Sequence, residues 1–428
     1  MNIHEPIPSF PPELVSQIIN ISASSKTLDH VKNLSLVSSF FRDECRKHVF
    51  RKITIGNDDG GTDDYEDGFD DSDQPTTETM PWISNFINLI RLHPHVIPYI
   101  QELDIVHPCS DEQELYRLAK ALKKHVFPKL SVCTLRFHGD TGDSEDHCKG
   151  VSSFFRVVPS MPALRQLNLQ HVDPVPPSIL ASCNQLEGLS LINVVFGGVT
   201  KAFNPTAPPP TLKSLHLEFS DYYCFELDPF TRLQRMDGAP IVNLSNLARL
   251  HLHIGGIRDV KAFSRLLESQ TNKVQSIETL ALTIDMTDPD HYGYYSTGYI
   301  PSNIPKQIEG WVLPNFRALT TLHIFYICVE KTIDLYYGLS GILASLETNN
   351  ILGDLKLQLE LRGGCRDNAG ESWKRLVDVL MKPGWAHLKE VMFVFDMPHL
   401  RAEREIFNPL GSQKNFNFRV EFRKIYEM

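Results

Sequence analysis

Apolar residues recur along most of the chain in a six-residue pattern, apolar-x-x-apolar-x-apolar, from about residue 81 toward the C-terminus. The last three positions of each copy alternate apolar, polar, apolar, which is the period of a half-buried strand. One such match arises by chance, but ten in order along one chain do not. The copies are IQELDI at 100, VCTLRF at 132, LRQLNL at 164, LEGLSL at 186, LKSLHL at 212, LARLHL at 247, IETLAL at 277, LTTLHI at 319, LGDLKL at 352 and LKEVMF at 388, with FRKITI at 50 as an eleventh candidate and FNFRVEF at 416 as a closing strand.

The segments between the copies are suited to lead the chain from one strand back to the next. Helical periodicity marks residues 111–126, 260–270 and 371–381, whereas residues 203–211 form a proline-rich loop. The copies begin 22 to 42 residues apart, a wider range than the roughly 20–29 residues of regular leucine-rich repeats. The pattern therefore predicts an α/β fold, an irregular leucine-rich-repeat solenoid of parallel strands with helical or loop returns, over residues 81–428.

Residues 6–52 follow a helical rather than a strand pattern. Pro11 and Pro12 are suited to a helix start, and the apolar residues that follow lie on one helical stripe. A second helix is predicted from about Thr27 to Leu36 and a third from about Ser39 to Val49. We therefore predict a separate three-helix domain at the N-terminus, which also serves as a cover for the first repeat.

Between these two parts, residues 53–80 are predicted to be an acidic insertion. The sequence from 56 to 79 is GNDDGGTDDYEDGFDDSDQPTTET, and residues 53–90 hold ten Asp or Glu and no Lys or Arg. Such a segment cannot bury enough apolar surface to offset its ordering entropy, so it is predicted to be disordered. Two interpretations stay open, a solvated insertion loop and an acidic docking segment for a basic partner.

The acidic segment also accounts for the net charge of −10, because the rest of the chain balances at 42 basic and 42 acidic residues. A general basic footprint for nucleic acid is therefore missing, and no nucleic-acid partner is expected. No apolar run approaches the roughly 18 residues of a membrane span, and the N-terminus has no secretory signal pattern. The eight cysteines form no CxxC pair, which favours reduced thiols in the cytoplasm or nucleus.

Local catalytic motifs are absent from the sequence. There is no GxSxG, HExxH, phosphate-loop or dinucleotide-binding glycine motif. Cys133, His138, His147 and Cys148 lie close in sequence, but their spacing matches no standard zinc-ligand pair. We therefore expect no catalytic residue, no metal and no cofactor, although an enzyme with a non-local site stays a weak alternative.

The N-terminal block and the repeats together resemble an F-box protein with leucine-rich repeats, of the irregular kind common in fungi. The resemblance is carried by Pro12-Glu13-Leu14, by the run Leu34-Ser35-Leu36-Val37-Ser38 and by Phe41-Arg42. It spans about 45 residues. The family usually opens with Leu-Pro where this chain has Phe10-Pro11, and it usually has Trp where this chain has Phe41. Both changes keep a large apolar group.

The resemblance implies a non-catalytic substrate receptor of an SCF-type ubiquitin ligase. The F-box would dock on the small adaptor subunit and, through it, on the cullin scaffold. The repeats would hold a protein substrate, still unknown, close to the ubiquitin-charged partner and so raise the local concentration of its lysines. The residues expected to bind the adaptor are Phe10, Pro11, Leu14, Ile18, Leu34, Leu36, Val37 and Phe41.

The polar positions between the strand leucines are expected to form the inner, concave surface of the solenoid. The middle row of this surface is predicted to read Asp104, Arg136, Asn168, Ser190, His216, His251, Ala281, His323, Lys356 and Met392. The expected substrate-binding residues are Asp104, Arg136, Asn168, His216, Arg249, His251, His253, His323 and Lys356.

Other interpretations of these features stay open. A merely solvated strand face has the same composition, and the loops 228–238 and 285–301 are rival binding sites. The tyrosines of the second loop are apt for recognition, because they offer large contact area at low entropic cost. For the whole chain, the alternative function is an interaction scaffold in which the helical block is only a cap.

Overall fold

The computed structural model describes most of the repeat region and the three N-terminal helices. Phe10, Pro11, residues 57–80 of the predicted acidic insertion, and most of the loops 228–238 and 285–301 lie outside the described residues. The described residues are 12–23, 29–37, 39–56, 82–108, 112–138, 147–197, 208–218, 230, 235–254, 257–269, 276–286, 316–328, 335–346, 351–361, 369–395, 408–412 and 416–422.

The chain divides into two compact units, Met1–His171 and Val172–Met428. These two units do not correspond to the three segments predicted from the sequence, and the segments stay predictions. The first unit contains α1 (Pro12–Ala23), α2 (Asp29–Leu34), α3 (Ser39–Val49), β1 (Lys52–Ile55), α4 (Trp82–Leu92), the 3-10 helix η1 (Pro94–Tyr99), β2 (Glu102–Pro108), α5 (Glu112–Lys124), β3 (Val132–His138), α6 (His147–Val157), the 3-10 helix η2 (Val158–Ser160) and β4 (Gln166–Gln170).

The second unit continues the same alternation of strands and returns. Its described elements are α7 (Ser178–Ser182), β5 (Gly188–Ile192), β6 (Ser214–Glu218), β7 (Arg249–Ile254), α9 (Ile257–Ser269), β8 (Thr279–Met286), β9 (Thr321–Cys328), α11 (Leu335–Leu346), β10 (Asp354–Leu361), α12 (Ala369–Leu380), β11 (Glu390–Phe395), α13 (Asn408–Gly411) and β12 (Asn417–Phe422).

The strands follow one another in chain order from β1 to β12. Their pairing is parallel, with the apolar residue of each repeat level with its counterpart in the next, as Leu103 is with Cys133 and Leu250 with Leu215 and Leu280. An α/β solenoid of parallel strands is thus confirmed, and the leucine positions of the sequence pattern define its register. The eleventh copy forms β1, and the predicted closing strand forms β12 beside β11.

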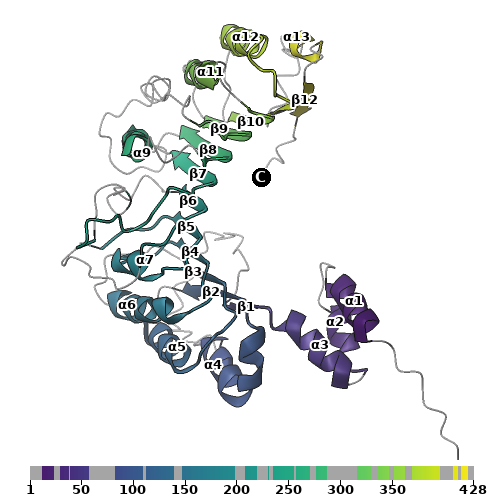
Figure 1. Ribbon diagram of the computed structural model, residues 1–428, viewed down its shortest axis with the longest axis vertical. Helices are drawn as coiled ribbons and strands as arrows, with labels where there is room; N and C mark the ends of the chain where they lie inside the picture. The colour runs from purple at the N-terminus through teal and green to yellow at the C-terminus, as the bar shows by residue number, and fades with distance from the viewer. Residues whose placement is uncertain are drawn as a thin grey trace, which may run out of the picture. The chain divides into compact units, whose positions relative to one another are not determined.

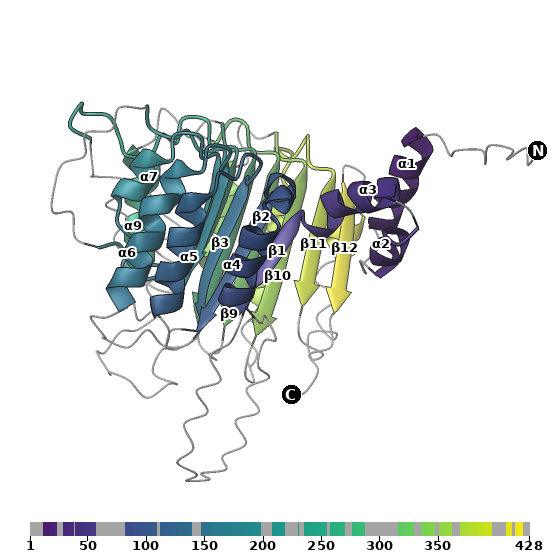
Figure 2. The same cartoon turned by 90° about the horizontal axis from the view of Figure 1, so that it is seen from below.

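The core lies between the strands and the returning helices. In Figures 1 and 2, α4–α6 cover one face of the strands of the first unit, and α9, α11 and α12 cover one face of the strands of the second. In α5 the apolar residues recur at helical spacing and are buried, whereas the remaining face is exposed. The strand residues that point into this core and are at most 2% exposed include Leu103, Ile105, Cys133, Leu135, Leu167, Leu169, Leu189, Leu191, Leu215, Leu217, Leu250, Leu252, Leu280, Leu282, Leu322, Ile324, Leu355, Leu357, Val391 and Phe393.

The structure corrects the register of one repeat. Thr134, not Arg136, is level with Asp104 of the preceding strand and Asn168 of the next. The copy in register is therefore LSVCTL at 130, two residues before VCTLRF, and its Leu130 is buried. The error arose because Phe137 is also apolar, so the six-residue pattern fits in two overlapping positions. A shift of two residues keeps Arg136 on the same face of the strand.

The predicted return helices are confirmed as α5, α9 and α12. The sequence pattern missed α4, α6 and α11, which also cover the sheet. Their buried side chains, such as Phe86, Phe154 and Ile342, do recur at helical spacing with neighbouring apolar residues. The three N-terminal helices form close to their predicted bounds, and the third begins and ends at the predicted residues, Ser39 and Val49.

The alternation of faces in β7 predicts opposite responses to two truncations on the same strand. Leu252→Ala should lower the free energy of unfolding by about 2–5 kcal/mol, because it leaves a cavity in the core. Arg249→Ala, on the exposed face, should change it by less than about 0.5 kcal/mol. Urea unfolding monitored by circular dichroism measures both. A larger loss from Arg249→Ala than from Leu252→Ala would contradict the described register.

Candidate functional site

The three N-terminal helices share a small apolar core. Ile19 of α1, Val31 of α2 and Cys45 of α3 are fully buried against one another. Leu34 and Phe41 pack against this cluster and are half-buried. Other described apolar side chains of the three helices lie outside this core.

Several of these remaining apolar side chains are strongly exposed. Leu36 is 78% exposed and Val37 66%, while Leu14, Phe40 and Ile18 are 45%, 42% and 40% exposed. Leu36 and Val37 lie in the turn after α2, where their backbone N–H groups donate to the carbonyls of Asn33 and Leu34 at 3.1 Å each. The turn is therefore hydrogen-bonded, and it holds two large apolar side chains in solvent without a packing role.

Four of the eight predicted adaptor-binding residues are among these exposed side chains. Leu14, Ile18, Leu36 and Val37 are exposed as that role requires, whereas Leu34 and Phe41 contribute to the small core. Phe10 and Pro11 lie outside the described residues. Sequence analysis missed Phe40, which is more exposed than the neighbouring Phe41. The sequence did contain a signal for its exposure. Consecutive residues of a helix point in different directions, so Phe40 and Phe41 cannot both face the same core.

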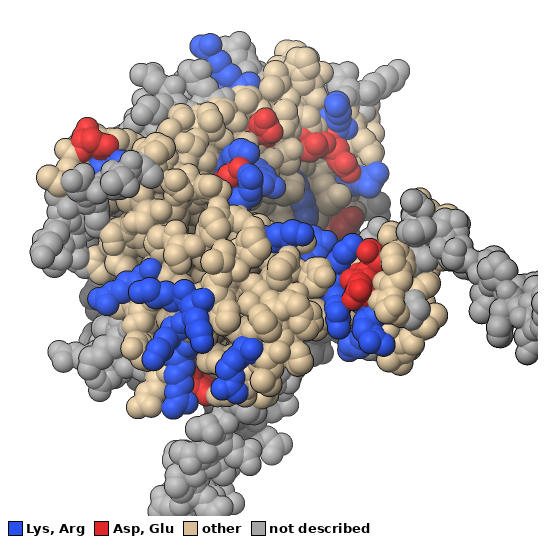
Figure 3. Space-filling view, turned by 60° about the horizontal axis from the view of Figure 1, so that its bottom comes forward, with Lys and Arg blue, Asp and Glu red and all other residues tan. Residues whose placement is uncertain are grey.

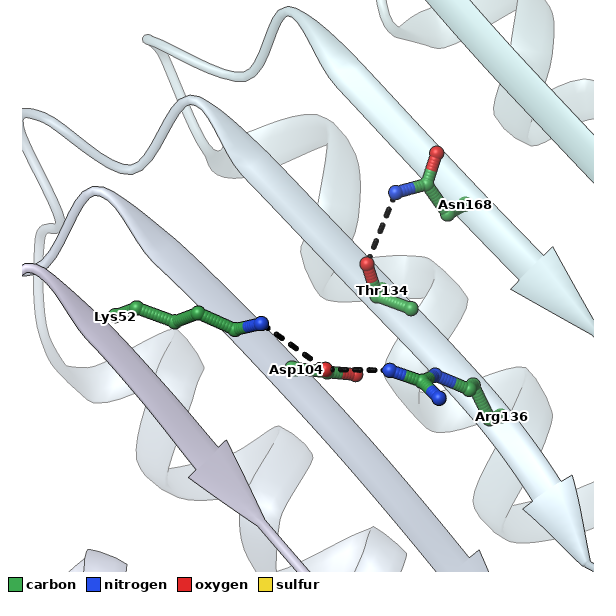
Figure 4. Close-up of polar contacts among 5 residues, drawn as sticks. All are labelled: Lys52, Asp104, Thr134, Arg136 and Asn168. Atoms are coloured by element: carbon green, nitrogen blue, oxygen red, sulfur yellow. Dashed lines mark hydrogen bonds and ion pairs between the residues drawn. The ribbon is translucent and has the colours of Figure 1, made fainter. Parts of the chain in front are cut away.

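On the face of β1–β3 opposite the helices, an ion-pair group is centred on Asp104. The Asp104 side chain is 7% exposed, and its Oδ2 lies 2.7 Å from Nη2 of Arg136 and 3.8 Å from Nζ of Lys52 (Figure 4). Its other carboxylate oxygen, Oδ1, is buried and has no hydrogen-bond partner within the described structure. Arg136 reaches Asp104 across the strands, although it lies two residues beyond the predicted row.

A second group of polar contacts adjoins this ion pair. Asn168 Nδ2 donates to Thr134 Oγ1 at 3.0 Å, and Gln166 Nε2 donates to Asn168 Oδ1 at 3.2 Å (Figure 4 shows the first of these contacts). Together the two groups give the first unit a hydrogen-bonded polar face with two cationic side chains around one buried carboxylate. Such a face is suited to polar recognition, since amides and hydroxyls can both donate and accept.

In the second unit, histidines dominate the corresponding face. The rings of His216 and His251 stack with centroids 4.1 Å apart and planes 6° apart. Ser190 Oγ lies 3.1 Å from His216 Nδ1, and His251 Nε2 lies 3.2 Å from Thr283 Oγ1. The predicted proximity of His216 and His251 is therefore confirmed, and it follows from their level positions in β6 and β7.

The histidine group interacts electrostatically with Glu218. His216 Nε2 lies 3.4 Å from Glu218 Oε2, and this interaction with His216 is the first cause of a lowered pKa for Glu218. Burial, followed by the nearby charge of His216, lowers the pKa of His251 from 6.5 to about 4. His251 is therefore neutral in the folded protein at neutral pH, which lets its ring stack closely on His216.

The other predicted substrate-binding residues lie along the same strands. His323 of β9 is level with Lys356 of β10, and burial, then the charge of Lys356, lowers its pKa. Arg249 is exposed and lies two residues before His251 in β7, and His253 lies two residues after it. The structure thus gathers the histidine positions in the second unit, while Asp104, Arg136 and Asn168 belong to the first.

Within the described residues, no group of three or more His, Cys, Asp or Glu side chains is arranged to hold a metal ion. Cys133 is buried in the core of β3, and the side chains of His138, His147 and Cys148 are outside what the structure describes. No described helix has both the length and the apolar content needed to cross a membrane.

Comparison with known proteins adds little to this picture. No family model and no curated protein matches the sequence. Among solved structures, the chain is similar to an internalin (inlF) from Listeria monocytogenes str. 4b F2365, with 10% identity, 80% of this chain and 90% of that chain covered, and a TM-score of 0.30. For an internalin C2 (inlC2) from the same organism the values are 14%, 64%, 92% and 0.25. TM-scores this low support no argument about function.

The Asp104 ion pair predicts an asymmetric response to substitution of its two partners. Arg136→Met should lower the free energy of unfolding by about 1–3 kcal/mol, because it leaves a buried carboxylate without its nearest donor. Asp104→Asn should cost less, since the amide oxygen still accepts from Arg136. In a double-mutant cycle measured by urea unfolding, Arg136→Met should cost less in the Asp104→Asn background. Additive effects would show that the pair is not coupled.

The lowered pKa of His251 predicts a stability loss in mild acid. The unfolded chain binds a proton at His251 near pH 6.5, but the folded chain resists it until about pH 4. The free energy of unfolding should therefore fall as the pH drops from 6.5 to 4, and His251→Gln should flatten this fall. Urea midpoints at several pH values between 7.5 and 4.5 measure it. The matched control is His387→Gln, an exposed histidine of the same unit, which should leave the profile unchanged.

Proposed function

We propose that this chain is a non-catalytic substrate receptor of an SCF-type ubiquitin ligase. In this role the N-terminal helices bind the adaptor subunit, and through it the cullin scaffold, and the solenoid binds a protein substrate. The observation that carries the proposal is the strong exposure of large apolar side chains on these helices and in the turn after α2, namely Leu14, Ile18, Leu36, Val37 and Phe40. It occurs on the helices whose sequence resembles an F-box.

The energetics of this surface favour a partner. Apolar surface removed from water contributes roughly 25 cal/mol per Å², so large side chains left in solvent forgo stabilisation that internal packing would provide. Large apolar side chains that are exposed next to one another, as Leu36 and Val37 are in sequence, favour a binding site over a merely solvated surface. Leu36 and Val37 are the clearest cases, because a hydrogen-bonded turn presents both side chains outward. A protein that covers them would gain the burial that the three-helix core lacks.

The polar strand face supports the second half of the proposal. It carries two groups of ordered polar side chains, around Asp104 in the first unit and around His216 and His251 in the second. Leucines on the opposite side of the same strands hold these groups in register. A protein substrate recognised there would be held by hydrogen bonds and charge, and ubiquitin transfer would take place at another subunit. The cytoplasm or nucleus, where such ligases act, also keeps the cysteines reduced.

An interaction scaffold without a ligase partner is the second candidate. The observation that favours it is the solenoid itself, because stacked repeats present extended binding surfaces. In that case the N-terminal helices are only a cap. The two functions differ in whether the exposed apolar side chains of these helices bind the SCF adaptor subunit.

The deciding experiment is calorimetric titration of the purified full chain with the SCF adaptor subunit. We expect binding by the parent and a loss of at least about 100-fold for the variant Leu36→Asp with Val37→Asp. Truncation of one central interface side chain commonly costs about 2 kcal/mol or more, and each 1.4 kcal/mol is tenfold in affinity. Both side chains lie in solvent, so the variant should keep its fold, which circular dichroism checks.

The matched control is Val126→Asp, which places the same charge at a 73% exposed side chain after α5. This variant should bind the adaptor as the parent does. A well-folded parent that fails to bind the adaptor would overturn the ligase proposal and leave the scaffold function. Equal loss of binding in the Val126→Asp control would show that the effect is not specific to the N-terminal helices.

A further inference from the structure

The outer surface of the first unit carries a strongly basic face. Figure 3 shows Lys and Arg side chains gathered over the α5–α6 region with almost no Asp or Glu among them. We call this the α5–α6 basic face. Its exposed residues are Arg117, Lys120, Lys123 and Lys124 of α5, Lys129 after it and Arg156 of α6.

Helix-end electrostatics account for only part of this face. Cations are favoured in the last turn of a helix, and Lys123, Lys124 and Arg156 lie in last turns. Arg117 and Lys120 lie earlier in α5, at spacings of three and four residues from other cations. Like charges at these spacings destabilise a helix. The face therefore costs stability unless an anionic group lies against it.

Few acidic side chains lie near these cations in the described part of α5 and α6. No ion pair is found there for Arg117, Lys120 or Lys124, and the α5 carboxylate of Glu114 is half-buried at the opposite end of the helix from Lys124. The chain itself supplies a matching excess of negative charge elsewhere in the sequence. Residues 57–81 contain ten Asp or Glu and no Lys or Arg.

Both ends of this acidic segment are fixed in the same unit as the basic face. β1 leads into Gly56, whose left-handed backbone (φ 112°) fits so tightly against Val106 that a Cβ would overlap the Val106 carbonyl. After the segment, α4 begins at Trp82 and packs beside α5. An extended chain spans at most about 3.3–3.6 Å per residue, so even ten residues reach farther than the roughly 20 Å length of α5.

We propose that the α5–α6 basic face binds the chain's own acidic segment, residues 57–81. Because the segment is tethered at both ends within the same unit, its effective concentration at the face is in the millimolar range. Weak, salt-sensitive charge pairs are then enough to keep it bound. In this arrangement the bound segment occupies the face and excludes other polyanions.

The test measures whether the tethered segment competes with the same sequence added in trans. A neutralised variant carries Asn for every Asp and Gln for every Glu within residues 57–81. The probe is a fluorescein-labelled peptide of residues 57–81, and its anisotropy is measured against the full-length parent and the variant at low salt. We expect the peptide to bind the neutralised variant at least about tenfold more tightly than the parent, and this binding to vanish at 0.5 M salt.

Matched substitutions locate the binding site. Adding Lys120→Glu and Lys124→Glu to the neutralised variant should abolish peptide binding. Adding Lys374→Glu and Lys389→Glu, two exposed lysines of the second unit, should leave it intact. Circular dichroism verifies that each variant is folded.

Three outcomes would overturn the proposal. The peptide would bind the parent and the neutralised variant equally, or bind neither of them, or bind independently of Lys120 and Lys124. A further experiment tests whether an external polyanion binds the face, with a single-stranded oligonucleotide or anionic vesicles as the probe. If either probe bound the parent as tightly as the neutralised variant through Lys120 and Lys124, the face would belong to that external polyanion and not to the acidic segment.

Discussion

The fold depends on one repeated contact between neighbouring repeats. A buried apolar side chain of each strand stacks on the side chain at the equivalent position of the next, parallel strand. A single strand with its return cannot bury its own apolar face, so each unit is stable only against its neighbours. Leu215, Leu250 and Leu280 show the pattern, because each is level with the next and almost fully buried. Return segments of very different lengths are accommodated because they do not set this register.

That constraint leaves the other face of the strands free for function. Side chains alternate along a strand, so each leucine in the core places its two sequence neighbours on the opposite face. Because the strands are in register, these neighbours lie level with their counterparts in the next strand. Polar residues there come into contact without having to stabilise the fold by apolar burial. The stacked rings of His216 and His251 and the Asp104–Arg136 ion pair both arise in this way. A polar surface of this kind presents hydrogen-bond donors and acceptors side by side.

The N-terminal helices present the opposite balance. Among the described residues their core is centred on Ile19, Val31 and Cys45, while Leu36 and Val37 are strongly exposed. The N-terminal helices therefore expose large apolar side chains, whereas the strands of the repeats expose polar ones. In the proposed function, the apolar side chains bind one partner and the polar face binds another. The charge on α5 and in the acidic segment adds a third, purely electrostatic element in the first unit.

The sequence by itself determined the repeat, the strand faces and the helices at the N-terminus, because each depends on a local period that the chain displays. It could not settle the register at Val132, since Phe137 allows two overlapping matches and only pairing with Leu103 and Leu167 decides between them. Nor could it decide which apolar residues of the helical block are buried. Leu34 and Leu36 look alike in sequence, and only the packing of three helices covers one and exposes the other. Exposure and side-chain partners depend on neighbours distant in sequence, so the tertiary structure alone decided them.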